Sequence, residues 1–367
     1  MLIVSLSGFF LLHCAQVAKL DPERNISSAP AQETHQSRYA FESCHAERKN
    51  YLEVDLMRMP TEYTQDHTEE FRNYIPMKCI QFAQRNFRGT FGRCENEESK
   101  PSVTSSRPCM TENYVNLTYN AYHDVMDCFN LDPKEFYLQI MIESGFHVNA
   151  FNKTGFDSGI AQFTGNGIKR IVTDNRIERT RRILLESSRN SCQRIASIVG
   201  SFDITSFIVE KRCAMISLPK NPYRGMLFNY LHTMLDQIDL RRQLDDELSN
   251  YIDIQNALTE KIKRQLVFLA YNRGMTGIKR LLSGYVENRK TMGQTPSEAD
   301  LDLDQNLTRA KKILGLEPTK RDLLKKSKIK KLSFAEYAVI NKATYVADMV
   351  AAQDYVRRHV GDECSRF

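Results

Sequence analysis

A chain of 367 residues with 41% apolar and 26% charged residues has the composition of an ordinary folded protein, which excludes a largely disordered or fibrous chain. The length suffices for one large domain or two ordinary ones. The formal net charge of +6 favours a polyanionic partner, such as a cell wall or a nucleic acid, and says little about the fold.

The N-terminus has the pattern of an export signal. Residues 1–18 are uncharged and contain a short apolar run from Leu2 to Leu12, which is too short to cross a bilayer. We expect residues 1–18 to be a signal peptide and the polar, turn-rich residues 19–38 to be a flexible leader. A lipoprotein signal is less favoured, because His13 stands before Cys14 where a small residue is needed. The mature protein is therefore expected to be secreted or periplasmic.

Cysteines suggest the same compartment. Eight remain after the signal, and an even number without a CxxC pair predicts disulfides in an exported chain, with buried free thiols as the alternative. Four of them fall in residues 39–110, which we expect to form a loop-rich, disulfide-rich N-terminal region. The pairing favoured by loop closure is Cys192 with Cys213. The eight are Cys44, Cys79, Cys94, Cys109, Cys128, Cys192, Cys213 and Cys364.

Beyond residue 110 the pattern changes to helical periodicity. Apolar residues recur at three- and four-residue spacing, which predicts a mainly α protein. Ser333 and Glu336 form a predicted capping box for a last helix that can continue to Arg358 without Gly or Pro. The periodic stretches are 119–129, 136–144, 226–240, 262–271 and 334–357.

Two charged stretches invite other interpretations. Asp300, Asp302 and Asp304 have the spacing of a calcium loop, but the loop lacks its Gly and its final Glu. The eight His residues form no HExxH, so we expect neither a metal nor another cofactor. The basic stretch 309–331 would suit an anionic wall or nucleic acid, or simply a solvated helical hairpin. Export argues against nucleic acid.

The segment 132–145 predicts a well-defined buried helix. Asp132 is a natural N-cap, Pro133 suits the first helical position, and Glu135 completes a reciprocal capping arrangement. Residues 136–142, FYLQIMI, are apolar nearly all round, and Gly145 ends the helix.

Glu143 falls in the last turn of this helix. Burial and the negative end of the helix dipole both disfavour its charged form, so a raised pKa is predicted. A carboxyl group that stays protonated near neutral pH suits a general acid for glycosidic cleavage. The alternative is a buried Glu satisfied by a structural partner.

The run from Glu143 to Gly167 resembles the signature of the lytic transglycosylase and goose-type lysozyme superfamily. In that signature a Glu-Ser pair ends a helix and is followed by a Gly-rich β-hairpin ending in Gly-Leu-Met-Gln, here residues 159–162. Ala270 to Gly274 resembles the family's Ala-Tyr-Asn-x-Gly motif, and Tyr355-Val356 is a weaker match to its last helix. The resemblance covers about residues 119–170, 260–282 and 350–360.

The resemblance implies a lysozyme-like helical domain with a small β-hairpin over residues 111–367, with insertions at about 175–260 and 284–332. It implies an enzyme that cuts the β-1,4 bond between N-acetylmuramic acid and glucosamine or N-acetylglucosamine in peptidoglycan. Separately from the resemblance, we expect a monomer. A non-catalytic wall-binding protein is the rival. The implied roles are Glu143 as acid/base, with substrate contacts from Ser144, Gln162, Tyr271, Asn272 and Tyr355, the Tyr271 hydroxyl pointing at Glu143.

The outcome of the reaction is left open by the sequence. An inverting hydrolase needs a second carboxylate to activate water, and Asp157 is the candidate, whereas a lytic transglycosylase manages with one and forms 1,6-anhydro ends. Hydrolysis is slightly favoured, although goose-type enzymes carry an aspartate where this chain has Phe163 and Thr164. Asp157 is equally typical of a turn residue.

Substrate details follow the same resemblance. The chain as a whole also resembles lysozymes of predatory bacteria that act on de-N-acetylated peptidoglycan, whose ammonium group Asp157 could meet. Trp is absent, so sugar stacking would fall to Tyr122, Phe151 or Phe163.

Overall fold

The computed structural model describes residues 61–86, 92–93, 109–110, 112–147, 150–152, 157–163, 176–199, 222–317, 320, 332–341, 343 and 345–366. These residues belong to one of the chain's two compact units, Ser43–Phe367. The predicted signal peptide and leader, and the basic residues 321–331, lie outside the described part.

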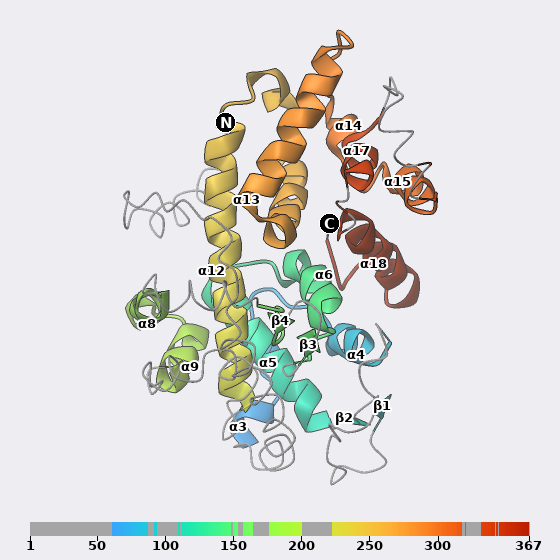
Figure 1. Cartoon of the computed structure of the whole chain (residues 1–367). Helices are drawn as coiled ribbons and strands as arrows, with labels where there is room; N and C mark the ends of the chain where they lie inside the picture. Colours follow the sequence, from blue (N-terminus) through green and yellow to red (C-terminus); the bar gives the residue numbers. More distant parts are fainter. Residues whose placement is uncertain are drawn as a thin grey trace, which may run out of the picture. The chain divides into compact units, whose positions relative to one another are not determined.

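The described part is mainly α-helical, as the periodicity predicted (Figure 1). No helix within it has the length and apolar character needed to cross a membrane. The helices are α3 (Thr61–Thr64), η3 (Thr68–Glu70), α4 (Met77–Asn86), α5 (Glu112–Cys128), α6 (Pro133–Ser144), α8 (Arg176–Glu186), α9 (Asn190–Val199), α12 (Pro222–Leu248), η4 (Ile252–Ala257), α13 (Glu260–Lys290), α14 (Glu298–Leu301), α15 (Leu307–Leu314), α17 (Phe334–Ile340) and α18 (Tyr345–His359).

Short strands accompany the helices. β1 (Gly92–Arg93) pairs in parallel with β2 (Cys109–Met110). β3 (Phe151–Asn152) pairs antiparallel with β4 (Asp157–Ser158), with Asn152 opposite Asp157. The residues that join β3 to β4 lie outside the described part.

The core is built around α5, α6, α12 and α13. α12 packs along both α5 and α13, so a segment expected to be an insertion contributes directly to the core. All residues of α6 from Phe136 to Ile142 are buried, which confirms the prediction from its apolar sequence. Its one polar member in this stretch, Gln139, accepts a 2.7 Å hydrogen bond from Gln237 of α12.

The ends of α6 follow the sequence with one exception. The Asp132 carboxylate accepts the backbone N–H of Lys134, and Gly145 ends the helix in the left-handed conformation. The predicted reciprocal cap by Glu135 is wrong: its carboxylate pairs with Arg264 of α13 at 3.0 Å. A cation on a neighbouring helix is a stronger partner for a carboxylate than one amide, so tertiary packing overrides the local cap.

Two disulfides join distant elements. Cys128 at the end of α5 bonds to Cys192 in α9, and Cys79 in α4 bonds to Cys364 near the C-terminus. The expected pairing of Cys192 with Cys213 is therefore wrong, because the packing of α9 on α5 brings Cys128 to Cys192. Cys44, Cys94 and Cys213 lie outside the described residues.

The predicted last helix is broken. Its capping box is present, with Ser333 and Glu336 bonded reciprocally, but α17 ends at Ile340 and α18 begins at Tyr345. Asn341 is the C-cap: its side-chain amide donates to the Tyr337 carbonyl at 2.9 Å and competes with continuation of the helix. The sequence carries no Gly or Pro to announce this break.

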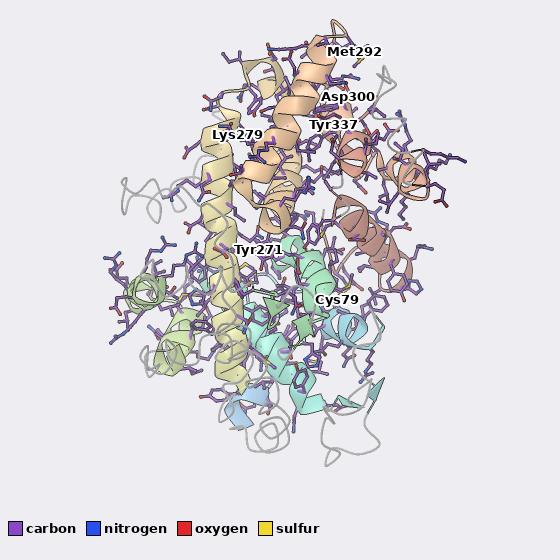
Figure 2. The ribbon with its side chains drawn as sticks, in the orientation of Figure 1. Cys79, Tyr271, Lys279, Met292, Asp300 and Tyr337 are labelled. Atoms are coloured by element: carbon purple, nitrogen blue, oxygen red, sulfur yellow. A yellow bond between two sulfur atoms is a disulfide. The ribbon has the colours of Figure 1, made fainter. Side chains whose placement is uncertain are left out.

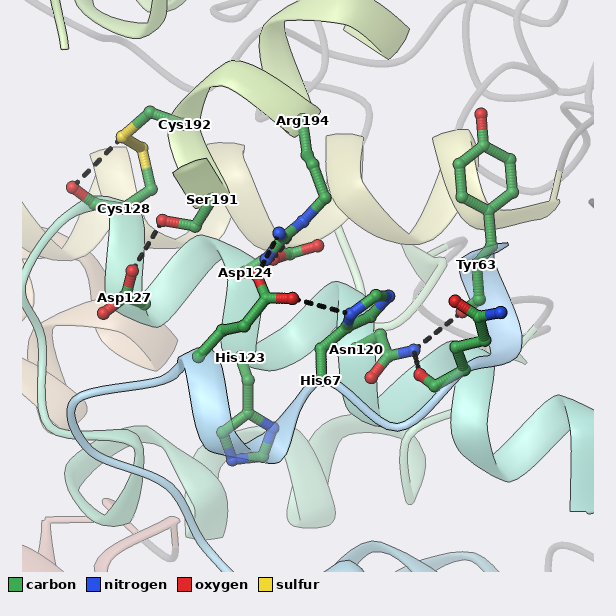
Figure 3. A network of polar contacts seen from close by, with 12 residues as sticks. Tyr63, His67, Asn120, His123, Asp124, Asp127, Cys128, Ser191, Cys192 and Arg194 are labelled. Atoms are coloured by element: carbon green, nitrogen blue, oxygen red, sulfur yellow. Dashed lines mark hydrogen bonds and ion pairs between the residues drawn. A yellow bond between two sulfur atoms is a disulfide. The ribbon is translucent and has the colours of Figure 1, made fainter. Parts of the chain in front are cut away.

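A buried carboxylate ties α9 and α12 to α5. Asp124 is fully buried and accepts a 2.6 Å hydrogen bond from Arg194 of α9 (Figure 3). It also accepts a hydrogen bond from the Tyr223 hydroxyl of α12. Arg194 also pairs with Glu70. Burial raises the pKa of Asp124, and the Arg194 guanidinium opposes the shift, so this pairing makes the buried charge tolerable.

The neighbouring His123 generates a stability prediction. Its Nε2 accepts the Ile75 N–H at 3.0 Å and its Nδ1 donates to the Tyr119 carbonyl, so the folded protein holds a neutral ring. Burial lowers the pKa of His123 from 6.5 to about 4. Between these values the unfolded chain binds the proton and the folded chain does not, so stability falls as pH falls through this window, by on the order of 3 kcal/mol.

Urea unfolding of the wild type and of His123→Leu checks this value. The advantage of the wild type over the variant should shrink by about 3 kcal/mol between pH 7 and pH 4. The buried His232, whose pKa burial also lowers, is present in both proteins and cancels. A pH-independent difference between the two proteins would contradict the prediction.

Candidate active site

Glu143 stands in the last turn of α6, partly exposed, between buried neighbours. Its Oε1 accepts a 2.7 Å hydrogen bond from the hydroxyl of Tyr345, the first residue of α18. Burial, and then the nearby Glu143 carboxylate, hold the pKa of Tyr345 well above its ordinary value. The phenol therefore keeps its proton and acts as a fixed donor to Glu143.

The backbone turns sharply after this residue. Gly145 and Phe146 both have positive φ angles, of 61° and 62°. The Phe146 ring is fully buried and packs edge-on against Tyr122 and at a tilt against Tyr137. The buried ring anchors the turn, so the end of α6 that carries Glu143 is fixed on both sides.

Ser144 is turned away from solvent. It is 7% exposed, and its Oγ donates a long, 3.4 Å hydrogen bond to the Ile140 carbonyl of its own helix. This back-bonding satisfies the hydroxyl locally. The substrate-orienting role implied for Ser144 stays a prediction.

Gln162 and Tyr271 meet at the turn that follows β4. The Tyr271 hydroxyl donates to the Ala161 carbonyl at 2.6 Å, and the Gln162 side chain donates to the Gly159 carbonyl at 2.8 Å. Gln162 has a φ of 50°, in the left-handed region that a Gln side chain seldom adopts. The two family-like motifs, far apart in sequence, are thus in direct contact.

Tyr271 makes a smaller contribution to the raised pKa of Tyr345, after burial and the Glu143 carboxylate. It projects from α13 (Figure 2) and is partly exposed, and the adjacent Asn272 is exposed. The Tyr271 proton is directed to Ala161. A hydroxyl that donates to Glu143 belongs to Tyr345, which sequence reasoning missed, and the expected direction of the Tyr271 hydroxyl toward Glu143 stays a prediction.

Gly274 explains how α13 can present this motif. It has φ 71° and ψ 159°, non-helical angles that split α13 into two helical segments. Such angles are essentially restricted to glycine. The first segment therefore ends directly after the Ala270–Arg273 part of the motif.

Tyr355 lies elsewhere on α18. It is ten residues beyond Tyr345, about 15 Å along a helix. Its ring packs against Phe82 of α4 and His359. The structure therefore does not bring Tyr355 to Glu143.

Two of the aromatic residues suggested for sugar stacking are unsuitable. Tyr122 is fully buried with its hydroxyl on the Pro133 carbonyl, and Phe163 is 3% exposed. Neither ring can meet a sugar face. The side chains of Phe151 and Asp157 lie outside the described part, although the Asp157 backbone is placed in β4.

Among the described residues no group of three His, Cys, Asp or Glu side chains could hold a metal ion. Asp302, from the calcium-like spacing, is occupied by Lys261 at 2.8 Å and Gln265 at 3.0 Å. The described candidate site offers the Glu143 carboxyl group, the Tyr345 phenol that keeps its proton, and the Tyr271 hydroxyl together with the amide groups of Gln162 and Asn272.

Comparison of this chain with protein-family models, with curated proteins and with solved structures finds no match.

The Gly274 kink yields a testable prediction. A Cβ at this position would meet nothing within 4 Å, so Gly274→Ala should cost only backbone strain, about 1–3 kcal/mol of unfolding free energy. Urea unfolding measures this. Gly293→Ala is the matched control, since Gly293 also has positive φ, 67°, and open space. Equal stability of Gly274→Ala and the wild type would show that the kink is not required.

Proposed function

We propose that the chain cleaves the β-1,4 glycosidic bonds of peptidoglycan glycan strands, with Glu143 as general acid/base. The observation that supports this most is the placement of Glu143: a partly exposed carboxyl at the end of a buried helix, held by the Tyr345 hydroxyl at 2.7 Å. A carboxyl held in one orientation can deliver a proton to a fixed glycosidic oxygen. The proposed fold is lysozyme-like, with β3 and β4 as its hairpin.

The proposed chemistry assigns separate tasks to the two carboxyl oxygens. Oε1 accepts the Tyr345 hydrogen bond, so the proton that leaves with the glycosidic oxygen is carried on Oε2. Loss of this proton leaves a carboxylate, which the Tyr345 donor then stabilises. In the transglycosylase alternative, which has a single carboxylate, the same group can then take up the proton of the attacking hydroxyl.

Gln162, Tyr271 and Asn272 are proposed to contact the sugar chain. The turn at Gly159–Gln162 is fixed by the Tyr271 hydroxyl, and the exposed Asn272 follows on the same helix. This arrangement supports a binding surface made jointly by the turn after β4 and the first segment of α13. De-N-acetylated strands are the proposed variant substrate, with an ammonium group for a carboxylate to bind.

Hydrolysis is the favoured outcome, with Asp157 activating water. An inverting hydrolase has its two carboxyl groups about 6.5–9.5 Å apart. A lytic transglycosylase, which uses the muramoyl C6 hydroxyl, is the alternative.

The two disulfides are compatible with a secreted or periplasmic enzyme.

Glu143→Gln tests the proposed role. It keeps the shape and removes the transferable proton, so glycan release should fall by at least about a hundredfold while folding is retained. Mass spectrometry of soluble fragments from acetylated and deacetylated peptidoglycan is the measurement. Reducing ends indicate hydrolysis and 1,6-anhydro ends the transglycosylase. Glu135→Gln, on the same helix and paired with Arg264, is the control.

The control should keep its activity. If Glu143→Gln releases glycan as fast as the wild type, Glu143 is not the general acid/base. A wild type that binds peptidoglycan and releases nothing would favour the wall-binding protein.

Tyr345→Phe tests the hydrogen bond to Glu143. Removing the donor disfavours the carboxylate by about 1 kcal/mol, so the pH at which activity declines on the alkaline side should rise by about 0.7 unit. The measurement is kcat/KM from pH 4 to pH 9. Tyr285→Phe, which loses a buried hydroxyl bonded to the Leu332 carbonyl, should leave the profile in place. A shift toward lower pH would contradict the assignment.

A further inference from the structure

The C-terminal tail, residues 361–366, contacts three helices, two of which carry the members of the Glu143–Tyr345 pair. Cys364 is bonded to Cys79 of α4, and the adjacent Glu363 pairs with Lys78 of the same helix (Figure 2 labels Cys79). Ser365 donates to the Gln353 side chain of α18 at 3.0 Å. The tail therefore joins α4 by a disulfide and an ion pair, and α18 by Ser365 and by Asp362, which accepts a hydrogen bond from Arg357 at 2.7 Å.

The same tail also holds α6. The Arg366 N–H donates to the Lys134 carbonyl at 3.0 Å, and its guanidinium lies 3.4 Å from the N-cap carboxylate of Asp132. On the other side of the disulfide, the Tyr137 hydroxyl of α6 donates to the Cys79 carbonyl at 2.7 Å. Both α6 and α18 are thus attached at Cys79–Cys364.

These attachments matter because α6 and α18 carry the two members of the Glu143–Tyr345 pair. Glu143 is nine residues from Lys134, about 14 Å along α6, and Tyr345 is eight residues from Gln353, about 12 Å along α18. The tail touches neither member of the pair, so it can act on them only by fixing the positions of the helices.

We propose that formation of the Cys79–Cys364 disulfide switches the candidate site on, by locking α18 against α6 so that Tyr345 stays bonded to Glu143. This inference rests on the function proposed above. Before oxidation only polar contacts hold the tail. The hydrogen bond from Tyr345 to Glu143 is then formed in a smaller fraction of the molecules, and the enzyme cleaves its substrate slowly. The cysteines are positioning residues, remote from the reacting atoms.

The oxidation balances as an ordinary thiol–disulfide exchange. The thiolate of one cysteine attacks a small-molecule or protein disulfide and expels one thiol. The second thiolate then displaces the remaining oxidant thiol, forming the Cys79–Cys364 bond. Two protons and two electrons leave with the oxidant, which ends as two thiols. Both sulfurs are fully buried once the disulfide has formed, so the exchange takes place while the tail is detached from α4.

The test compares Cys79→Ser/Cys364→Ser with Cys128→Ser/Cys192→Ser. The second disulfide is similarly buried and joins α5 to α9, neither of which contributes to the pair. We expect Cys79→Ser/Cys364→Ser to lose roughly tenfold in kcat with little change in KM. Its alkaline limb should rise by as much as that of Tyr345→Phe. Adding Tyr345→Phe to it should give no further shift. The control variant should keep the wild-type profile.

If the Cys79→Ser/Cys364→Ser variant does not fold, stepwise reduction of the oxidised wild type tests the same proposal. Near-UV circular dichroism reports folding, and mass spectrometry after alkylation reports which disulfide has opened. Loss of activity that follows opening of Cys79–Cys364 while the near-UV signal persists supports the switch.

Three results overturn the proposal: activity lost only together with the near-UV signal, equal pH shifts in both double variants, or a wild-type profile in Cys79→Ser/Cys364→Ser. An oxidised wild type that releases no glycan is a different result. It removes the proposed function itself.

Discussion

A carboxyl group at the C-terminal end of a buried helix is in an unfavourable place for a negative charge. The carbonyl dipoles of α6 point toward Glu143, and its neighbours leave it only partly exposed to water. The 2.7 Å hydrogen bond from Tyr345 stabilises the charged form. The rest of the site depends on how the surrounding elements bring Tyr345, the first residue of α18, to Glu143 in the last turn of α6.

The break between α17 and α18 at Asn341 helps to bring Tyr345 to Glu143. A helix continuous from residue 334 to residue 358 would fix the direction of every side chain along it. With α17 ending at Ile340, α18 can take its own direction and begin at Tyr345. The Arg273 guanidinium of α13 donates to the Asn341 carbonyl at 3.3 Å, which joins this break to the motif that carries Tyr271.

Local features were predictable and long-range ones were not. The start, burial and end of α6 follow from residues within one or two turns, as does the Ser333–Glu336 cap. Other partners depend on packing between residues 64 to 285 positions apart, as in Cys128–Cys192 and Cys79–Cys364. The Tyr345–Glu143 bond spans 202 positions, and an unremarkable Tyr in a helical pattern gives no signal of it.

Backbone strain gives an independent indication of where function lies. Of the three non-glycine residues with positive φ in the described part of the chain, Phe146 and Gln162 flank the candidate site, and the third is an Asn, which tolerates this conformation. Such angles cost free energy and persist only where the surroundings impose them. At Phe146 the buried ring imposes the angle, and at Gln162 the side-chain bond to Gly159 helps to do so. Because a merely structural loop could relieve this cost with glycine, the non-glycine residues at these two positions favour a ligand-binding role for the turns that carry them.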